Sequence, residues 1–137
     1  MSDIPRRLAD SVVGRARDRC EYCGLSQDGQ EATFHIDHAV SRAANGPTAE
    51  GHLALACLSC SLRKGMKRNA IDPDTGEEAP LFNPRSEKWE DHFRWDDERV
   101  VPLAPTGRAT VAALALNRPI ILSIRGEESE RGRHPPG

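Results

Sequence analysis

Aromatic residues, long apolar stretches and a strong net charge are all scarce or missing in this 137-residue chain. It has two Trp, one Tyr and three Phe, and its formal net charge is −2 at pH 7. No stretch approaches the roughly 20 apolar residues of a membrane-spanning helix, so we expect no membrane association. The small net charge gives no overall indication of a nucleic-acid partner. A chain of this length is expected to form one domain with a modest core.

Cysteine is also scarce, but the four cysteines are arranged in an informative pattern. They form two Cys-x-x-Cys pairs, Cys20–Cys23 and Cys57–Cys60. Each pair can present two thiolates to one ion, and two pairs complete a tetrahedral four-cysteine zinc (Zn²⁺) site. A closed site of this kind leaves no position for a substrate, so we expect the zinc to be structural. Because metal binding contributes directly to folding free energy, it offsets the thin core.

Disulfides and a redox dithiol are the alternative interpretations of the four cysteines. Residues 1–7 are not followed by an apolar run and do not resemble a signal peptide. We therefore expect a cytoplasmic protein, in which thiols stay reduced. A thioredoxin-like motif would place one pair within a βαβ pattern, and the sequence has no such pattern. Both points favour zinc.

Charge is distributed unevenly along the chain. Residues 1–68 hold ten Lys and Arg against eight Asp and Glu, whereas residues 69–137 hold nine against 13. Several basic residues directly follow the second cysteine pair: Arg63, Lys64, Lys67 and Arg68. Basic groups beside a site can engage phosphates even when the whole chain is acidic. A solvated helix face is the alternative interpretation of this group.

The sequence pattern predicts an α+β fold with a central strand–loop–strand–helix unit. Apolar residues at every fourth position predict an N-terminal helix over residues 5–17. The central unit is expected to comprise a strand at 32–36, a long loop at 41–51, a strand at 53–56 and a helix at 60–67.

The second half of the chain is expected to add hairpins and helices. The predicted elements are a turn over 71–77, a hairpin of 92–95 with 99–103, a helix over 107–116 capped by Thr106, and a helix over 119–125. The charged tail, residues 127–137, is expected to be disordered.

The order and spacing of several short motifs resemble those of the HNH endonuclease family. These motifs are Cys20-x-x-Cys23-Gly24, Asp37-His38, Leu53–Ala56 followed by Cys57-x-x-Cys60, and Lys64-Gly65. Leu81–Arg85 and Trp89–Trp95 are similar to the C-terminal extension of a bacterial subgroup. The resemblance implies one HNH-type domain over residues 1–126. It would have a zinc-stabilised ββα-metal core at 18–68, an N-terminal helix, and a hairpin-plus-helix extension at 69–126.

The resemblance also implies an activity, namely hydrolysis of phosphodiester bonds in DNA with a divalent cation, Mg²⁺ or Mn²⁺. His38 matches the general base, and Asp37 matches the carboxylate that holds the cation. His52 is a third catalytic candidate: it stands where the family usually has an Asn that pins the loop and orients the catalytic His, and its imidazole could partly replace that amide. Ser61 stands where the family usually has a His or Asn ligand. Either Ser61 or His35, which shares a strand face with Asp37, could complete the cation site.

Two functional hypotheses remain open. The retained Asp37-His38 pair favours an endonuclease that acts on DNA, with RNA as the alternative substrate. The departures at His52 and Ser61 favour a non-catalytic zinc module that binds nucleic acid or a protein partner through a degenerate site. One chain presents one such site, so cutting both strands would need a homodimer or two events. The expected nucleic-acid-binding residues are Arg42, Arg63, Lys64, Lys67 and Arg68.

Overall fold

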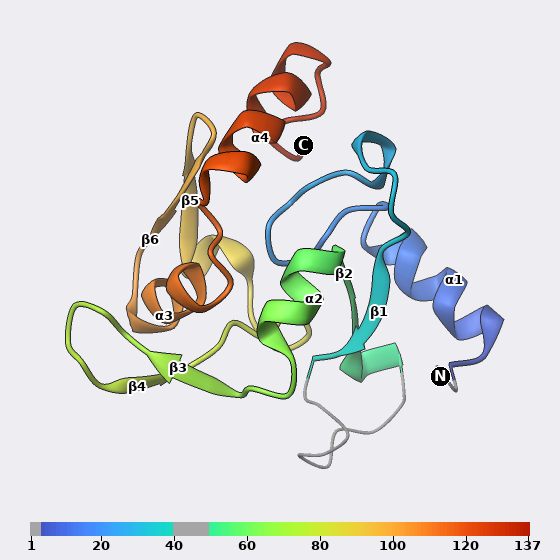
Figure 1. Cartoon of the computed structure of the whole chain (residues 1–137). Helices are drawn as coiled ribbons and strands as arrows, with labels where there is room; N and C mark the ends of the chain where they lie inside the picture. Colours follow the sequence, from blue (N-terminus) through green and yellow to red (C-terminus); the bar gives the residue numbers. More distant parts are fainter. Residues whose placement is uncertain (1–3, 40–49) are drawn as a thin grey trace. The chain divides into compact units, whose positions relative to one another are not determined.

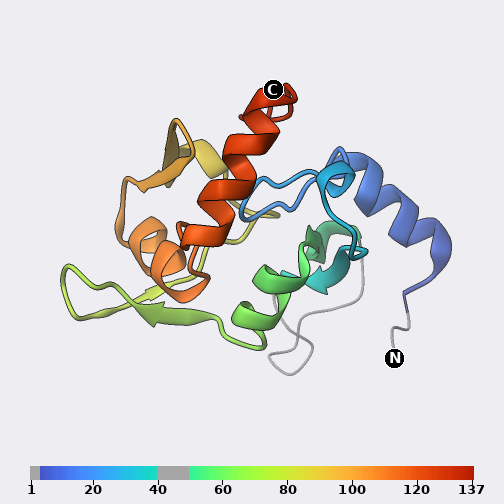
Figure 2. The ribbon, with the colours of Figure 1, turned by 45° about the horizontal axis from the view of Figure 1, so that its top comes forward.

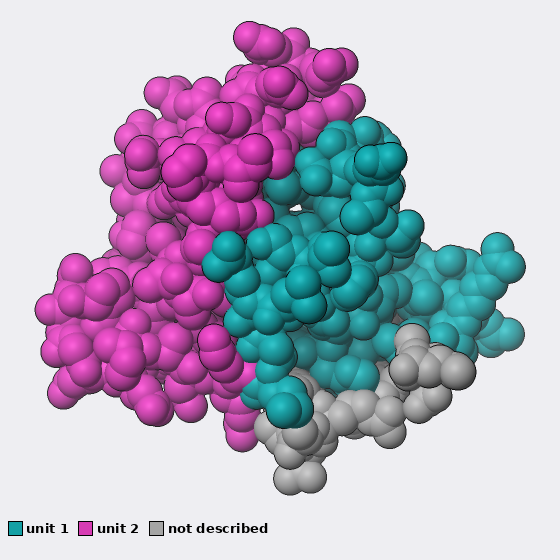
Figure 3. Space-filling view, viewed as in Figure 1, with its two compact units in different colours: residues 1–66, 83–85 teal, residues 67–82, 86–137 magenta. Residues whose placement is uncertain are grey.

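The computed structural model describes residues 4–39 and 50–137. The described residues form an α+β fold with three separate two-stranded antiparallel sheets, as the sequence predicts for the fold class (Figure 1). The chain divides into two compact units, which Figure 3 shows in different colours. Unit 1 comprises residues 1–66 and 83–85, and unit 2 comprises residues 67–82 and 86–137. The expectation that both belong to one domain stays a prediction.

Unit 1 contains the predicted order of strand, strand and helix. Its described elements are α1 (Arg6–Arg15), η1 (Gln27–Gly29), β1 (His35–His38), η3 (Glu50–His52), β2 (Leu53–Ala56) and α2 (Leu58–Lys64). Most of the predicted loop between the strands, residues 41–49, lies outside the described residues. β1 and β2 pair antiparallel, and α2 packs against both strands (Figure 1, Figure 2).

β1 begins three residues later than the sequence pattern predicts. The side chain of Gln27 explains this difference, because it hydrogen-bonds the backbone of the segment before the strand. Its Oε1 accepts from the Phe34 amide at 2.7 Å, and its Nε2 donates to the Ala32 carbonyl at 2.9 Å. The Ala32 carbonyl and the Phe34 amide are thereby bonded to a side chain and not to a partner strand, and the ladder starts at His35.

α2 begins and ends earlier than predicted. It begins after Cys57, whose sulfur accepts a hydrogen bond from the Cys60 amide at 3.4 Å and so caps the helix. It ends at Gly65, which has φ 53° and ψ −129° and therefore leaves the helical conformation. The sequence did not predict a helix start after Cys57, because a cysteine thiol is an unusual capping group.

Four buried residues, Leu53–Ala56, make β2 the centre of unit 1. The register pairs Asp37 with Ala54 and His38 with Leu53. α1 contributes the fully buried Val12, and its Arg15 Nη2 donates to the Leu53 carbonyl at 2.8 Å. The strand that carries the candidate site is therefore held by a buried neighbour.

Unit 2 contains the predicted hairpin, and the predicted turn over 71–77 connects a second pair of strands. Its elements are β3 (Asn69–Ile71), β4 (Glu78–Pro80), η4 (Trp89–Asp91), β5 (Phe93–Asp96), β6 (Arg99–Pro102), α3 (Pro105–Ala113) and α4 (Pro119–Glu130). The prediction that Thr106 caps α3 is wrong. The N-cap is Ala104, Pro105 occupies the first turn, and the Thr106 carbonyl accepts from Thr110 Oγ1 at 2.7 Å.

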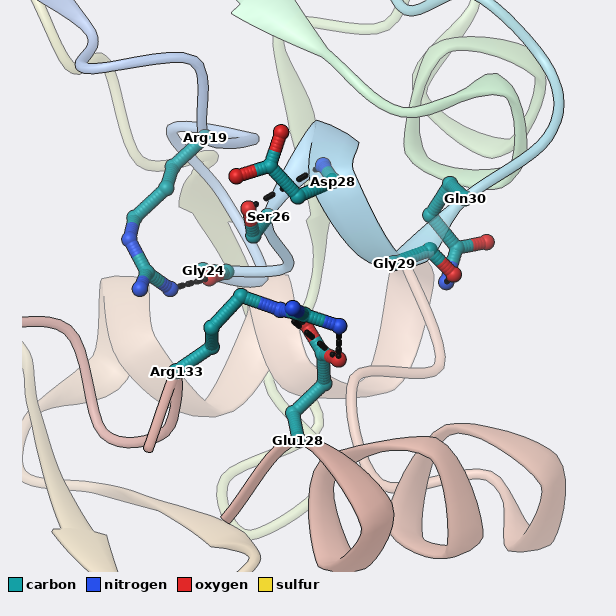
Figure 4. Close-up of polar contacts among 8 residues, drawn as sticks. All are labelled: Arg19, Gly24, Ser26, Asp28, Gly29, Gln30, Glu128 and Arg133. Carbon is teal, nitrogen blue, oxygen red and sulfur yellow. Dashed lines mark hydrogen bonds and ion pairs between the residues drawn. The ribbon is translucent and has the colours of Figure 1, made fainter. Parts of the chain in front are cut away.

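The expected disorder of residues 127–137 also needs correction. α4 continues to Glu130, and the buried Glu128 forms an ion pair with Arg133 at 2.6 Å (Figure 4). His134 Nε2 donates to the Asp97 carbonyl at 2.8 Å, and its ring lies edge-on to Trp95. The charged composition of this segment indicates disorder. The specific pairs that order it depend on three-dimensional contacts, which composition does not reveal. Within the described residues, no helix is both long and apolar enough to cross a membrane.

One buried ion pair in unit 2 predicts sensitivity to acid. Asp72 is 1% exposed and accepts two hydrogen bonds from Arg108, at 2.9 and 2.8 Å. Arg108 lowers the pKa of Asp72 from its ordinary value of 3.8 to about 2. Asp72 therefore stabilises the folded state above pH 3.8, and this contribution is lost as the pH falls through about 2.

We expect the free energy of unfolding of unit 2 to fall over this acid range. Asp72→Asn should lower that free energy at neutral pH and make it depend less on pH in acid. Both Trp residues of the chain lie in unit 2, so their fluorescence during an acid titration measures the effect. Asp74→Asn is the matched control, because Asp74 also pairs with Arg108, at 3.3 Å, but its side chain is 70% exposed, where solvent weakens the pair. Identical acid curves for Asp72→Asn and the parent would contradict the prediction.

Candidate active site

The four cysteines form one buried cluster in unit 1. All four are reduced, and their sulfur atoms lie within 4.8 Å of one another. The sulfurs of Cys23 and Cys57 are 3.7 Å apart. Four sulfurs at about 2.3 Å from a central zinc, at tetrahedral angles, would lie about 3.8 Å from one another. The spacing therefore fits a structural metal such as zinc and is far too long for a disulfide, which needs about 2.05 Å.

Backbone hydrogen bonds shape the loop that carries the first cysteine pair. Cys23 donates its amide to the Cys20 sulfur at 3.5 Å, and Gly24, with φ 80°, donates its amide to the Cys20 carbonyl at 2.9 Å. Arg19 Nη1 then donates to the Gly24 carbonyl at 2.8 Å (Figure 4). Only glycine adopts this backbone conformation at little cost, which explains the Cys-x-x-Cys-Gly pattern.

The cysteine thiols influence one another strongly. Hydrogen bonding with the Cys20 sulfur raises the pKa of Cys23 and of Cys60 well above the usual range, and burial raises both further. Hydrogen bonds from the same group of sulfurs lower the pKa of Cys57. These shifts favour the protonated form of the Cys23 and Cys60 thiols, so a metal that binds there must displace their protons.

Glu21, between the first two cysteines, links the cluster to two other segments. Its carboxylate accepts from the Leu55 amide at 2.8 Å and pairs with Arg85. Burial raises the pKa of Glu21, and the Leu55 amide and Arg85 act in the opposite direction. Arg85 belongs to the Leu81–Arg85 motif, and the sequence alone indicates no role for it. Its role is to join residues 83–85 to unit 1 through Glu21.

Asp37 and His38 are the last two residues of β1, and both are partly exposed. Neighbouring residues on a strand point to opposite faces, so the pair can serve one phosphate only where the strand ends or bends. β1 ends at His38, and the chain bends at Ala39. The Ala39 amide donates to the His52 carbonyl at 2.8 Å. This backbone contact fixes the end of β1, and the role of the His52 side chain stays a prediction.

A second polar cluster lies between β1 and α2. His35 Nδ1 is 3.2 Å from Ser61 Oγ, which joins the first residue of β1 to the helix. Lys64, one turn after Ser61, is 3% exposed and donates Nζ to the His38 carbonyl at 3.3 Å. Burial lowers the pKa of Lys64, and the charge of Asp37 acts against this shift. The Lys64 ammonium is therefore close enough to Asp37 to interact with it.

The structure changes the interpretation of the basic residues. Arg63, Lys67 and Arg68 are exposed, and Arg63 Nε donates to Ser59 Oγ at 3.2 Å. Lys64 is instead buried, and its Nζ donates to the His38 carbonyl, so its binding to nucleic acid stays a prediction. Arg42 lies outside the described residues.

Comparison with protein families supports the resemblance derived from the motifs. Residues 20–67 match the family model described as HNH endonuclease. The matched segment contains all four cysteines and the Asp37-His38 pair, the motifs on which the predicted resemblance rests. The match indicates a nuclease-type function with a nucleic-acid substrate. Comparisons with curated proteins and with solved structures return no match.

Proposed function

We propose that this protein is a divalent-metal-dependent endonuclease that hydrolyses phosphodiester bonds in DNA. The observation that carries the proposal is the Asp37-His38 pair at the end of β1, within the segment that matches the HNH model. The cysteine cluster supports it, because it joins the loop after α1 to the start of α2. Zinc is the ion we assign to the four thiolates, with a purely structural role.

The chemistry assigned to this site is hydrolysis by an activated water. Asp37 would hold a divalent cation, Mg²⁺ or Mn²⁺, which would neutralise charge on the phosphate and on the leaving oxygen. Neutral His38 accepts a proton from a water molecule, whose oxygen then bonds to phosphorus. The bond between phosphorus and the leaving oxygen breaks, and that oxygen takes a proton from solvent. The reaction leaves one new phosphate end and one new hydroxyl end.

Neighbouring groups hold this pair in place. Lys64 donates to the His38 carbonyl, and the Ala39 amide donates to the His52 carbonyl, so the strand end is fixed on two sides. We assign phosphate contacts along the DNA to the exposed Arg63, Lys67 and Arg68.

The second candidate function is a non-catalytic zinc module that binds nucleic acid or a protein partner. Ser61 favours it, because a hydroxyl is a weaker ligand than the imidazole or amide usual at this position. A labelled DNA duplex and an RNA of the same sequence, incubated with zinc-loaded protein and Mg²⁺, Mn²⁺ or EDTA, distinguish the two. Metal-dependent cleavage of DNA supports the endonuclease. Binding of the DNA or of the RNA, without cleavage under any condition, supports the non-catalytic zinc module.

Restoring the usual family residues should raise activity. We expect Ser61→His to add a nitrogen ligand, and His52→Asn to firm the loop behind His38. An imidazole binds transition ions better than a hydroxyl does, so the gain should be larger with Mn²⁺, Co²⁺ or Ni²⁺ than with Mg²⁺. Metal affinity and plasmid cleavage by the single and double variants measure this. Ser59→His, which places an imidazole on another side of α2, is the matched control. Parent-like affinity and rate in the double variant would contradict the prediction.

A further inference from the structure

The hydrogen bond between His35 and Ser61 has a specific consequence for metal binding. It engages Nδ1 of the ring at 3.2 Å, so Nε2 is the nitrogen that can face an ion. Histidines that bind metals usually have their other ring nitrogen held in this way, which fixes the tautomer and orients the ring. His35 is exposed at the start of β1, so the ring is accessible.

His35 and Asp37 lie on the same face of β1. The regular pairing of His35 with Ala56 and of Asp37 with Ala54 shows that the strand is not interrupted between them. Residues two apart on a strand share a face and are separated by about 6.8 Å along it. An imidazole and a carboxylate that lean towards each other from such positions can meet at one ion. Ser61 faces the same side, because its hydroxyl contacts His35.

The charges on this face favour an ion that binds nitrogen well. Asp37 supplies one negative charge, and the buried Lys64 ammonium interacts with it. Among the described residues, no carboxylate other than that of Asp37 contacts His35 or Lys64. With little net negative charge available, the imidazole decides which ions bind. Transition ions such as Mn²⁺, Co²⁺ and Ni²⁺ bind imidazole better than Mg²⁺ does.

We propose that His35 and Asp37 together hold the divalent cation, and that Ser61 orients the His35 ring. The imidazole that this domain lacks on α2 is then supplied from β1. This inference rests on the proposed function in one respect, the assignment of a divalent cation to Asp37. It adds the second protein ligand and predicts a preference for Mn²⁺ over Mg²⁺.

Binding of Mn²⁺ to zinc-loaded protein, measured from the electron paramagnetic resonance signal of free Mn²⁺, tests the inference without any activity. We expect Ser61→Ala to weaken binding by about tenfold, as is typical for the loss of a group that orients a ligand. We expect His35→Gln to weaken it by more than Ser61→Ala does. His92→Gln makes the same chemical change in unit 2 and should leave this binding unchanged. Equal zinc content in all variants confirms that the fold persists.

A second measurement needs no variant. Small amounts of Mn²⁺ added to the parent protein should broaden the ring proton resonances of His35 before those of His92. The inference is overturned if the His35 resonances are unaffected, or if His35→Gln binds Mn²⁺ as tightly as the parent. It is also overturned if Ser61→Ala costs more affinity than His35→Gln, because Ser61 would then be the ligand.

The outcomes separate this inference from the proposed function. If Mn²⁺ binds through His35 but DNA stays intact with every ion, the endonuclease proposal fails and the metal site stands. If DNA is cleaved and His35→Gln binds Mn²⁺ like the parent, the endonuclease proposal stands and the metal site fails.

Discussion

Cys23→Ser is expected to unfold unit 1. Cys23 is fully buried, and its sulfur lies 3.7 Å from that of Cys57 in the four-sulfur cluster. Structural zinc in small domains contributes an apparent free energy of about 10–16 kcal/mol at pH 7. That is as large as the whole unfolding free energy of a typical domain, about 5–15 kcal/mol. Circular dichroism and zinc analysis of the purified variant should show loss of helix and strand signal together with loss of zinc.

Ser26→Ala is the matched control for this prediction. Ser26 is also buried beside the first cysteine pair, and its side chain accepts from the Asp28 amide at 3.1 Å (Figure 4). Loss of a capping hydroxyl costs about 1 kcal/mol, so this variant should keep its fold and its zinc. A Cys23→Ser protein with parental zinc content and an unchanged spectrum would show that the cysteine cluster is not a structural metal site.

His38→Ala is expected to abolish cleavage and leave the fold intact. The side chain is partly exposed, so its loss removes little packing. The hydrogen bond from Lys64 is kept, because it is made to the His38 backbone carbonyl. Loss of a general base usually lowers the rate by about 10²–10⁴-fold. Initial rates of DNA cleavage, together with DNA binding measured by fluorescence anisotropy, should show a lost rate and retained binding.

His92→Gln controls for the removal of a histidine as such. His92 lies in unit 2, where it pairs with Glu87 at 3.1 Å, and its replacement should not change the rate of cleavage. If His38→Ala cuts as fast as the parent, His38 is not the base and the assigned mechanism is wrong.

Local patterns in the sequence were sufficient to predict much of the fold. β2 occupies the predicted residues 53–56 because a short apolar run between a loop and a cysteine pair has few alternatives. The two Cys-x-x-Cys pairs predicted the sulfur cluster because the two ligands within each pair are close together in the sequence, where the pattern can be recognised. The hairpin of β5 and β6 followed from the turn residues 96–98.

Contacts between residues far apart in the chain explain the features that the sequence does not predict. Lys64 belongs to a basic cluster in the sequence, and only its contact with the His38 carbonyl, 26 residues away, shows that it is buried. Glu21 and Arg85 are 64 residues apart, so no local pattern connects them. The His35–Ser61 contact depends on how α2 packs on β1, which short motifs do not specify.

The most direct test of the central claim is the incubation of supercoiled plasmid with zinc-loaded protein, in the presence of Mn²⁺ or Mg²⁺ and in EDTA. A single cut anywhere in a plasmid relaxes it, so this measurement detects even slow hydrolysis. We expect nicked circles to accumulate with Mn²⁺, more slowly with Mg²⁺, and not at all in EDTA. Plasmid that stays supercoiled with every divalent ion, at protein concentrations that bind it, would contradict the proposed endonuclease activity.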